Sequence, residues 1–458
     1  MKKQMLLRNY RRQKRLMLVA ALVLTSISMV WLPIWLTAGG LVLFWLAHEA
    51  WLSDHVFYSA SADYHYEFAS DWHREVEFAN GIVAHDGSAP ANSYVLEIAL
   101  RSTLLGYFRD PRIVIDGVCF EFERGTRGRR YVCLQTPPQQ MKPVHCQIAG
   151  PLRLHGFQHK NFATQRLLVI APHADDAELA AFGLYSQTRE IMIVTLTQGE
   201  IEAEKYQRLG LSAASAAALK GRLRSWDSMA IPLWGNVAQE RCVQLGYCCM
   251  QLGPMRANPN EGFPSLESGA SDTRPARIWN KIALPSDRDG SPNWTNLVCD
   301  LRSLLECFQP DAIITPDPEL DPHPDHIAAT QAIAEAVKQA SHRPSSYLLY
   351  ANHLHNNDRW PMGPAGGGIG LPPRFVTGHP QRIYLHPLTP AQQLDKAMAL
   401  GMQHDLQEPL TLKKVARRIV QRWLTGREWP ATGSNEYFRK AVRSSELFRL
   451  RTTLDDTE

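Results

Sequence analysis

A long charge-free run near the N-terminus constrains this chain more than any other feature. From Leu16 to Ala47 there is no Asp, Glu, Lys, Arg or His. One membrane crossing needs about 20 apolar residues, and the core of a signal peptide is shorter still. The run therefore predicts a membrane segment rather than a core helix, which in a soluble protein seldom stays uncharged for so long. No cleavage pattern of small residues follows it, so we expect the segment to be retained.

Pro33 divides this run, and two topologies fit it. One is a helical hairpin of two short crossings, about 16–32 and 34–50, and the other is a single long, tilted, kinked span. Seven Lys and Arg residues in the first fifteen positions place the N-terminus in the cytoplasm. A hairpin leaves the body on the cytoplasmic face of the cell inner membrane, whereas a single span puts it on the periplasmic face. The run is long for one hydrocarbon core of about 30 Å, which favours the hairpin.

The charge balance of the chain and its cysteine pattern limit the partners and the compartment that we expect for it. The chain has 49 Lys and Arg against 45 Asp and Glu, and without the basic N-terminus the acidic residues slightly exceed the basic ones. Such a body has no general polyanion-binding surface, so we expect no nucleic-acid partner. The eight Cys residues form no C-x-x-C pair and no zinc-finger spacing. They are typical of buried free thiols in a reducing compartment.

Residues 55–160 predict a small antiparallel β-sandwich domain after the membrane segment of residues 1–54. Residues 114–123 are rich in β-formers and predict one strand, with a turn at 125–128 and a return strand at 130–134. Residues 95–100 and 146–154 predict further strands. Such folds often bind sugars, but a packing or spacer role is an equally good interpretation.

Residues 161–410 predict a second, α/β domain. Nearly continuous apolar runs indicate strands buried on both faces, and helical patterns follow them. The expected strands are 166–171, 190–196 and 311–315, and the expected helices are 178–188, 213–229 and 326–340. This alternation predicts a Rossmann-like catalytic domain with a mostly parallel sheet.

Two polar clusters directly follow buried strands of this domain. One is the segment His173-Ala-Asp-Asp-Ala-Glu178, and the other is Asp321-Pro-His-Pro-Asp-His326. Ligands of open α/β sheets bind beyond the carboxyl ends of the strands, so the two loops are expected to converge. Three N/O ligands with one open position are typical of catalytic zinc, and His173, Asp176 and the second histidine pair can supply them. Acidic and imidazole groups remain as proton acceptor and donor for a hydrolysis.

These motifs resemble the PIG-L/LmbE family of zinc-dependent N-acetylglucosaminyl deacetylases and related amidases. The family's A-H-P-D-D-x-E motif corresponds to Pro172–Glu178, and its H-P-D-H motif is matched in full at His323–His326. Residues 195–200, Thr-Leu-Thr-Gln-Gly-Glu, also resemble the family's strand and Gly turn. The resemblance covers about residues 165–340, extending at most to 410. Ala174 and Pro172 depart from the first motif, but no ligand is lost, so we expect activity to survive.

The resemblance implies a role for each matched position. His173, Asp176 and His326 would bind Zn²⁺, and Asp175 would be the general base. His323 would be the acid that polarises the amide or protonates the leaving amine. Asp325 would orient His323. Glu178 would brace the first loop.

Several neighbouring segments carry weaker expectations. Asp317, Glu319 and Asp321 either contact substrate hydroxyls or cap the following helix. Asn352, His353 and His355 are expected in a solvated loop rather than in a sugar pocket. The Gly-rich segment 361–373 follows no buried strand and predicts a mobile flap over the site, not a phosphate-binding loop.

Residues 411–458 predict a basic C-terminal helical tail. One helical face collects apolar residues and the opposite face is basic; the apolar residues are Leu412, Val415, Ala416, Ile419, Val420 and Trp423. Such a helix either lies on an anionic leaflet or packs its apolar face on the catalytic domain. The second interpretation is the one we expect, with the basic face solvated.

Together these features predict a membrane-anchored zinc N-deacetylase. Its substrate would be an N-acetylhexosamine in a glycan, glycolipid or polysaccharide precursor at the membrane, cut to a free amine and acetate. One alternative is a zinc amidase on another small N-acyl compound. Another is a non-enzymatic membrane glycan-binding protein with the α/β domain as scaffold. A serine esterase is excluded by the lack of a G-x-S-x-G elbow after a strand.

Overall fold

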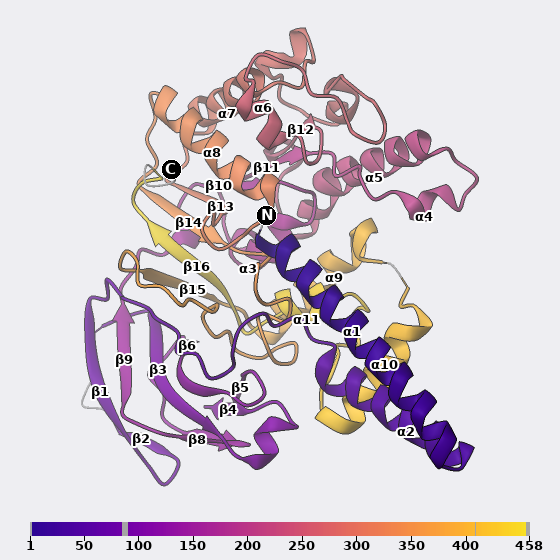
Figure 1. The fold of residues 1–458 in the computed structure, drawn as a ribbon. Helices are drawn as coiled ribbons and strands as arrows, with labels where there is room; N and C mark the ends of the chain where they lie inside the picture. The colour runs from indigo at the N-terminus through magenta and orange to yellow at the C-terminus, as the bar shows by residue number, and fades with distance from the viewer. Residues whose placement is uncertain (1, 85–89, 408, 455–458) are drawn as a thin grey trace.

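The computed structural model describes residues 2–84, 90–407 and 409–454. Residue 1 and residues 455–458, the outermost parts of the predicted N-terminal segment and C-terminal tail, lie outside them. The chain has a mixed α/β fold (Figure 1). A helical hairpin comes first, a β unit follows, and an α/β unit with its C-terminal extension completes the molecule.

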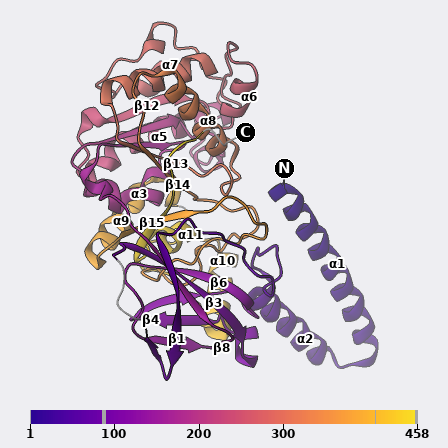
Figure 2. The same ribbon diagram turned by 90° about the vertical axis from the view of Figure 1, so that its left-hand side faces the viewer.

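The charge-free run forms two helices that stand away from the body (Figure 2). They are α1 (Lys2–Trp31) and α2 (Ile34–Ala47), and a π-helical turn, η1 (His48–Leu52), continues the second. The break falls at Pro33, whose ring and missing N–H prevent a continuous helix. Within the described ranges, α1 is the one helix long and apolar enough to cross a membrane, and none of that stretch is buried.

The β unit consists of two antiparallel sheets. The larger has the order β2-β1-β9-β3-β6, with β8 also pairing with β3, and the smaller has the order β5-β4-β7. Apolar side chains from both sheets, such as Leu96, Ile113 and Leu154, share one core. The strands are β1 (Trp72–Ala79), β2 (Ile82–Ala84), β3 (Ser93–Ser102), β4 (Arg112–Ile115), β5 (Val118–Glu121), β6 (Arg127–Leu134), β7 (Met141–Val144), β8 (Cys146–Ile148) and β9 (Leu152–Phe157).

The prediction of a single strand at 114–123 is wrong. The chain turns inside it at Asp116 and Gly117, whose φ angles are 46° and 85°. These are the angles of a tight two-residue hairpin turn, for which Asp-Gly is a preferred sequence. The result is the β4–β5 hairpin, and β6 pairs with β3 instead of returning along β5.

The α/β unit contains a seven-stranded sheet of order β12-β11-β10-β13-β14-β16-β15. The first five strands are parallel, and β16 runs antiparallel to both of its neighbours. The strands are β10 (Leu167–Ala171), β11 (Ile191–Thr197), β12 (Cys242–Tyr247), β13 (Ala312–Pro316), β14 (Ser346–Tyr350), β15 (Arg382–Pro387) and β16 (Ser445–Arg451).

Helices cover both faces of this sheet (Figure 1). Side chains of α6, α7 and α8 share one apolar core with the sheet, and those of α3, α5 and α9 share the other. The helices of the α/β unit and the C-terminal extension are α3 (Asp176–Ser186), α4 (Glu204–Gln207), α5 (Ala213–Trp234), α6 (Leu252–Ala257), α7 (Trp294–Phe308), α8 (Pro324–Gln339), α9 (Pro390–Met402), α10 (Leu412–Thr425) and α11 (Glu436–Ala441). Short 3₁₀ turns are η2 (Leu104–Tyr107), η3 (Phe162–Thr164), η4 (Gln239–Arg241), η5 (Arg274–Arg277), η6 (Pro285–Arg288) and η7 (His404–Leu406).

The Gly-rich segment 361–373 is not a free flap. Most of its residues are buried, and the Arg443 guanidinium donates to the carbonyl oxygens of Met362, Gly363, Pro364 and Gly368. Backbone bonds also join it to the β unit, including Gly368 N–H to the Cys119 carbonyl. The segment is therefore a packed connection between the β unit and the α/β unit.

The C-terminal extension also differs from the expected helical tail. Its last described strand, β16, lies inside the seven-stranded sheet between β14 and β15. In α10 most of the expected packing is reversed: of the expected apolar face Val420 is buried, but Leu412 is 89% exposed and Trp423 is 78% exposed. Gln421 and Thr425, on the opposite side of the same helix, are buried.

Candidate metal centre

Two loops from neighbouring parallel strands build the site. Strand β10 ends at Ala171, and the chain passes through His173 into helix α3. Strand β13, hydrogen-bonded to β10, leads through residues 317–323 into helix α8. His323 is the N-cap of that helix. Because both loops leave the same edge of the sheet, His173, Asp176 and His326 meet although they lie far apart in sequence.

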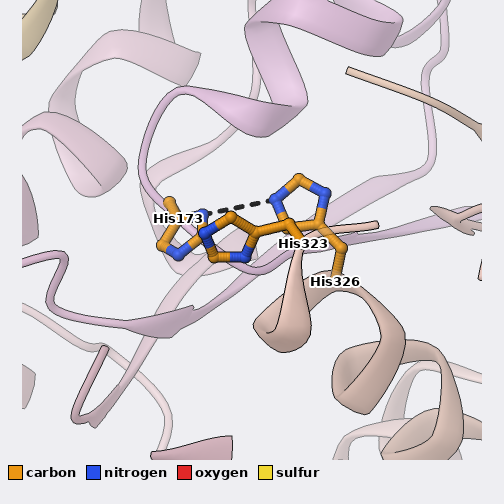
Figure 3. A group of neighbouring side chains, drawn as sticks. All are labelled: His173, His323 and His326. Atoms are coloured by element: carbon orange, nitrogen blue, oxygen red, sulfur yellow. Dashed lines mark hydrogen bonds between the residues drawn. The ribbon is translucent and has the colours of Figure 1, made fainter. Parts of the chain in front are cut away.

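Three of the predicted ligands face one point. His173 Nδ1 lies 3.1 Å from Asp176 Oδ2, and His326 Nε2 lies 3.1 Å from the same oxygen. The two imidazole nitrogens are 3.4 Å apart, as the dashed line in Figure 3 marks. Donors that surround a tetrahedral metal at about 2.0–2.1 Å are themselves about 3.3 Å apart. The three donors therefore match the coordination shell of a small divalent cation.

A second layer of side chains orients these ligands. The Asp321 carboxylate lies 2.9 Å from His326 Nδ1, and Asn352 donates to Asp176 Oδ1 at 2.7 Å. His353 Nδ1 lies 3.3 Å from Asp321. Such partners fix the tautomer and the direction of metal ligands. Asp321 and Asn352 thus belong to the centre, whereas Asp317 and Glu319 pair with Arg449.

The electrostatics of this layer favour a cation. Burial lowers the pKa of His326, but the Asp176 and Asp321 carboxylates raise it more, to about 10. His326 and Asp321 are both fully buried. A divalent ion is expected to displace protons from these nitrogens when it binds.

Asp325 has contacts with both histidines. Its Oδ2 is 3.4 Å from His173 Nε2 and accepts the Met250 N–H at 2.6 Å, and its backbone N–H donates to His323 Nδ1 at 3.3 Å. Cys249 Sγ lies 3.5 Å from both His173 Nε2 and Asp325 Oδ2. Sequence reasoning placed Cys249 only among buried thiols, and no local motif marks it.

His323 is held as a neutral imidazole. Burial and the neighbouring His173 and His326 rings lower the pKa of His323 to about 3. Its Nδ1 accepts the Asp325 backbone N–H at 3.3 Å. In the neutral form the proton therefore belongs on Nε2, and the ring lies 4.9 Å and 4.8 Å from the His173 and His326 rings.

The Asp175 carboxylate forms an ion pair with a buried arginine. Arg224 from α5 donates to its Oδ1 at 2.8 Å, and the same guanidinium contacts Asp405. Arg224 is buried, so this pair is poorly screened by solvent. The carboxylate that follows His173 by two positions is thus held in one orientation. Sequence reasoning missed Arg224, which lies inside a helix without a neighbouring motif.

Glu178 stabilises the first loop through buried hydrogen bonds. It is fully buried, and burial raises its pKa to about 8. The Gln403 amide donates to Glu178 Oε2 and to the Ala174 carbonyl, each at 3.0 Å, and the Tyr185 hydroxyl donates to Oε1. The Gln403 amide therefore joins Ala174, which replaces the Pro of the family motif, to Glu178 in helix α3.

One known family matches this part of the chain. Residues 168–337 match the PIG-L family model, described as GlcNAc-PI de-N-acetylase. The PIG-L resemblance is confirmed. The match spans both metal-facing loops and supports a metal-dependent amide hydrolase. No curated protein matches the chain in sequence.

Several solved structures are similar to part of this chain. A triple mutant of a deacetylase of the teicoplanin biosynthetic pathway is 16% identical, over 64% of this chain and 100% of that one, with a TM-score of 0.34. The zinc-inhibited form of teicoplanin deacetylase Orf2 is 17% identical over the same shares, with a TM-score of 0.33. A conserved protein from Thermus thermophilus is 19% identical, over 62% and 94%, with a TM-score of 0.31. Such low values carry no information on this chain's substrate.

Proposed function

We propose that this protein is a membrane-anchored, zinc-dependent N-deacetylase that hydrolyses the acetamido group of an N-acetylhexosamine. The observation that carries the proposal is the set of three donors, His173 Nδ1, Asp176 Oδ2 and His326 Nε2, spaced 3.1–3.4 Å apart. A carboxylate base, Asp175, and an imidazole hydrogen-bond donor, His323, belong to the same two loops. Two N donors and one carboxylate suit Zn²⁺, with one position left for water or substrate. When bound there, zinc would act as a Lewis acid on the amide carbonyl and lower the pKa of water.

Asp175 is the proposed general base. Arg224 occupies its Oδ1, so Oδ2 is the oxygen that we assign to accept a proton from the attacking water. The same carboxylate can return that proton to the amine as the carbon–nitrogen bond breaks. The products are then acetate and a free amino sugar.

His323 is the proposed electrophile. As a neutral imidazole with its proton on Nε2, it can donate a hydrogen bond to the developing oxyanion without giving up the proton. This differs from the role of a protonated acid. The carboxylate of Asp325 would keep the His173 ring in place instead.

The proposed anchor is the α1–α2 hairpin, with the body on the cytoplasmic face of the inner membrane. Lys3, near the start of α1, donates to the Leu354 carbonyl at 3.2 Å and pairs with Asp358 at 2.8 Å. The start of α1 therefore lies on the body, and so does the end of α2. A single span would separate them. The basic start of α1 then favours the cytoplasmic side, near a membrane-bound N-acetylated glycan precursor.

The test is acetate release by the full chain in lipid nanodiscs. Substrates would run from free N-acetylhexosamines through nucleotide-linked to lipid-linked forms, each with and without chelator. Asp175→Asn is the inactivating variant, and Asp272→Asn, an exposed carboxylate paired with Arg274, is the matched control. Chelator-sensitive release that only Asp175→Asn loses supports the proposal. Zinc binding without release from any compound would contradict an N-acetylhexosamine substrate, and neither zinc nor release would contradict the enzyme.

A further inference from the structure

The outward face of α10 is apolar. Leu412 is 89% exposed, Ile419 54% and Trp423 78%, and the three follow one another along one side of the helix. Lys413 and Arg422, also exposed, lie on the two sides of this stripe. A surface helix that packs on a protein core would show the opposite arrangement. The apolar stripe is therefore available to something outside the chain.

Specific contacts on the inner side of α10 hold it in this orientation. Arg417 pairs with the buried Glu49 carboxylate of η1. Gln421, itself buried, donates to the Glu49 carbonyl and to Ser53 Oγ, each at 3.2 Å. Polar side chains thus fasten α10 to the end of the membrane hairpin. Rotating the helix to bury its stripe would break these bonds and remove the Arg417 guanidinium from the buried Glu49 carboxylate.

A second apolar element lies against the same hairpin end. The turn η2 exposes Leu104 by 79% and Leu105 by 58%, and Phe108, directly after it, by 51%. The Trp51 indole of η1 donates to the Phe108 carbonyl at 2.9 Å, with the two rings 6.0 Å apart. Residues 48–53 therefore contact both exposed apolar elements, and Figure 1 shows α2 and α10 next to each other at the same end of the molecule.

We propose that the α10 stripe and the η2 loop rest in the headgroup and acyl boundary of the leaflet that the hairpin enters. This rests on the proposed hairpin anchor, because both surfaces contact the segment that follows the hairpin. Leu, Ile, Trp and Phe side chains with flanking Lys and Arg match the composition of interfacial helices. The bilayer, rather than a protein, is the occupant because Glu49 and Trp51 fix both surfaces directly beside the segment that enters lipid.

These two membrane contacts would fix the orientation of the body, which the hairpin anchor alone does not do. A hairpin alone leaves the body free to pivot about residues 48–53, whereas two additional contacts on either side of them restrict the body to one orientation. Lys413 and Arg422 would then face the phosphates of an anionic leaflet. The seated orientation would hold the catalytic unit at a constant height above the bilayer.

Fluorescence quenching in nanodiscs made of zwitterionic and anionic phospholipids can test this seating. Leu105→Cys and Trp423→Cys, each with the exposed native Cys307 changed to Ser, would carry a small fluorophore. Ile27→Cys in α1 is the positive control. Leu266→Cys, 69% exposed in the loop between α6 and α7, is the solvent control. Quenchers are lipids with a nitroxide at shallow acyl depth and aqueous iodide, and acetate release is measured on every sample.

We expect labels at positions 105 and 423 to be quenched several-fold more by the nitroxide lipid than the label at 266, and several-fold less by iodide. Equal iodide quenching at 105, 423 and 266 would overturn the proposal, as would lipid quenching at only one of the two positions. Protection from iodide without lipid quenching would indicate a second protein copy and would also overturn it. Absence of lipid quenching at position 27 would show that the hairpin does not enter the bilayer. That result would contradict both the proposed anchor and the proposed seating. Acetate release reports on the deacetylase independently of all these outcomes.

Discussion

At the scale of single residues, Asp175 and the metal-facing donors have separable tasks. Asp175 contacts Arg224 through Oδ1, so Asp175→Asn should keep the bond from Arg224 and the donor set. Losing a general base usually costs about 10²–10⁴-fold in rate. We expect that loss in kcat for acetate release, with the bound zinc per chain unchanged.

The experiment pairs single-turnover rates with metal analysis of the same samples. Asp272→Asn, on an exposed ion pair, should change neither quantity. An Asp175→Asn variant that released acetate at the wild-type rate would assign the base elsewhere. A variant that lost its zinc would show instead that Asp175 acts on the metal.

Asp321 has a different task, because it contacts a ligand and not the reacting atoms. Its carboxylate lies 2.9 Å from His326 Nδ1. Removing such a partner typically weakens metal binding by about 10–100-fold. We expect Asp321→Asn to lose zinc to a competing chelator at a correspondingly lower chelator concentration, and to recover activity when zinc is added in excess. Activity that stayed low at saturating zinc would contradict this assignment.

Residue chemistry was predictable only where a motif marked it. His173, Asp176 and His326 were all predicted as ligands from two short motifs, and the fold brings them together. Asp321 was noticed because it begins the second polar cluster, but its contact with His326 depends on a turn that sequence does not reveal. Cys249 and Arg224 come from other parts of the chain, and only the folded sheet places them beside the centre.

At the scale of secondary-structure elements, the β4–β5 turn depends on one glycine. Gly117 has a φ of +85°, and a Cβ built there would meet no atom within 4 Å. Gly117→Ala therefore tests backbone strain without steric overlap. The left-handed conformation costs a non-glycine residue roughly 1–2 kcal/mol. We expect the free energy of unfolding to fall by about that amount, measured by urea denaturation of the full chain in detergent.

Gly253→Ala is the matched control for this strain. Gly253 also has open space around it, but it lies in helix α6 and has no positive φ. Ala there should be neutral or slightly stabilising because glycine is a poor helix former. Equal effects of the two substitutions would show that the turn tolerates alanine and would contradict the strain argument.

Elements buried on both faces were the easiest to predict. The runs at 166–171, 190–196 and 311–315 correspond to β10, β11 and β13 within one residue at each end. A parallel strand that is covered on both faces leaves a continuous apolar run, which few other short elements produce. Strand β16 was missed because it alternates Glu and Arg with apolar residues inside a tail that looked basic and helical. The β4–β5 turn was missed because β-formers surround Asp116 and Gly117 without interruption.

At the scale of the whole molecule, one buried ion network joins units that are distant in sequence. Arg359, between β14 and β15, donates to Asp110 at 2.8 Å and to Glu121 at 3.1 Å, both in the β unit. Arg427, after α10, donates to Asp54, just beyond the hairpin, at 3.0 Å. No sequence pattern pairs residues so far apart. The hairpin, the β unit and the catalytic unit are therefore tied through charges that only the complete fold brings together.

Glu121 makes this network sensitive to pH. Burial and the neighbouring Asp110 raise the pKa of Glu121 to about 7, above its ordinary value of 4.5. The folded protein therefore binds this proton more tightly than the unfolded chain. Stability from Glu121 is fully present below about pH 4.5 and is lost as the pH rises through about 7, an effect of up to about 3 kcal/mol. Asp110 has the opposite sign, because the surrounding Arg359, Arg427 and Arg124 side chains outweigh burial and lower its pKa to about 2. Its contribution is lost only in stronger acid.

Glu121→Gln removes the titrating group but keeps the size and polarity of the side chain. We expect the thermal unfolding temperature of the wild type to fall between about pH 5 and pH 8 relative to this variant, with the two curves separating as the pH approaches 7. Glu75→Gln is the control, because its carboxylate is 70% exposed in β1. Parallel pH curves for wild type and Glu121→Gln would contradict a raised pKa. Parallel curves with the variant less stable at every pH would show in addition that Glu121 is ionised throughout and supports Arg359 as a charged partner.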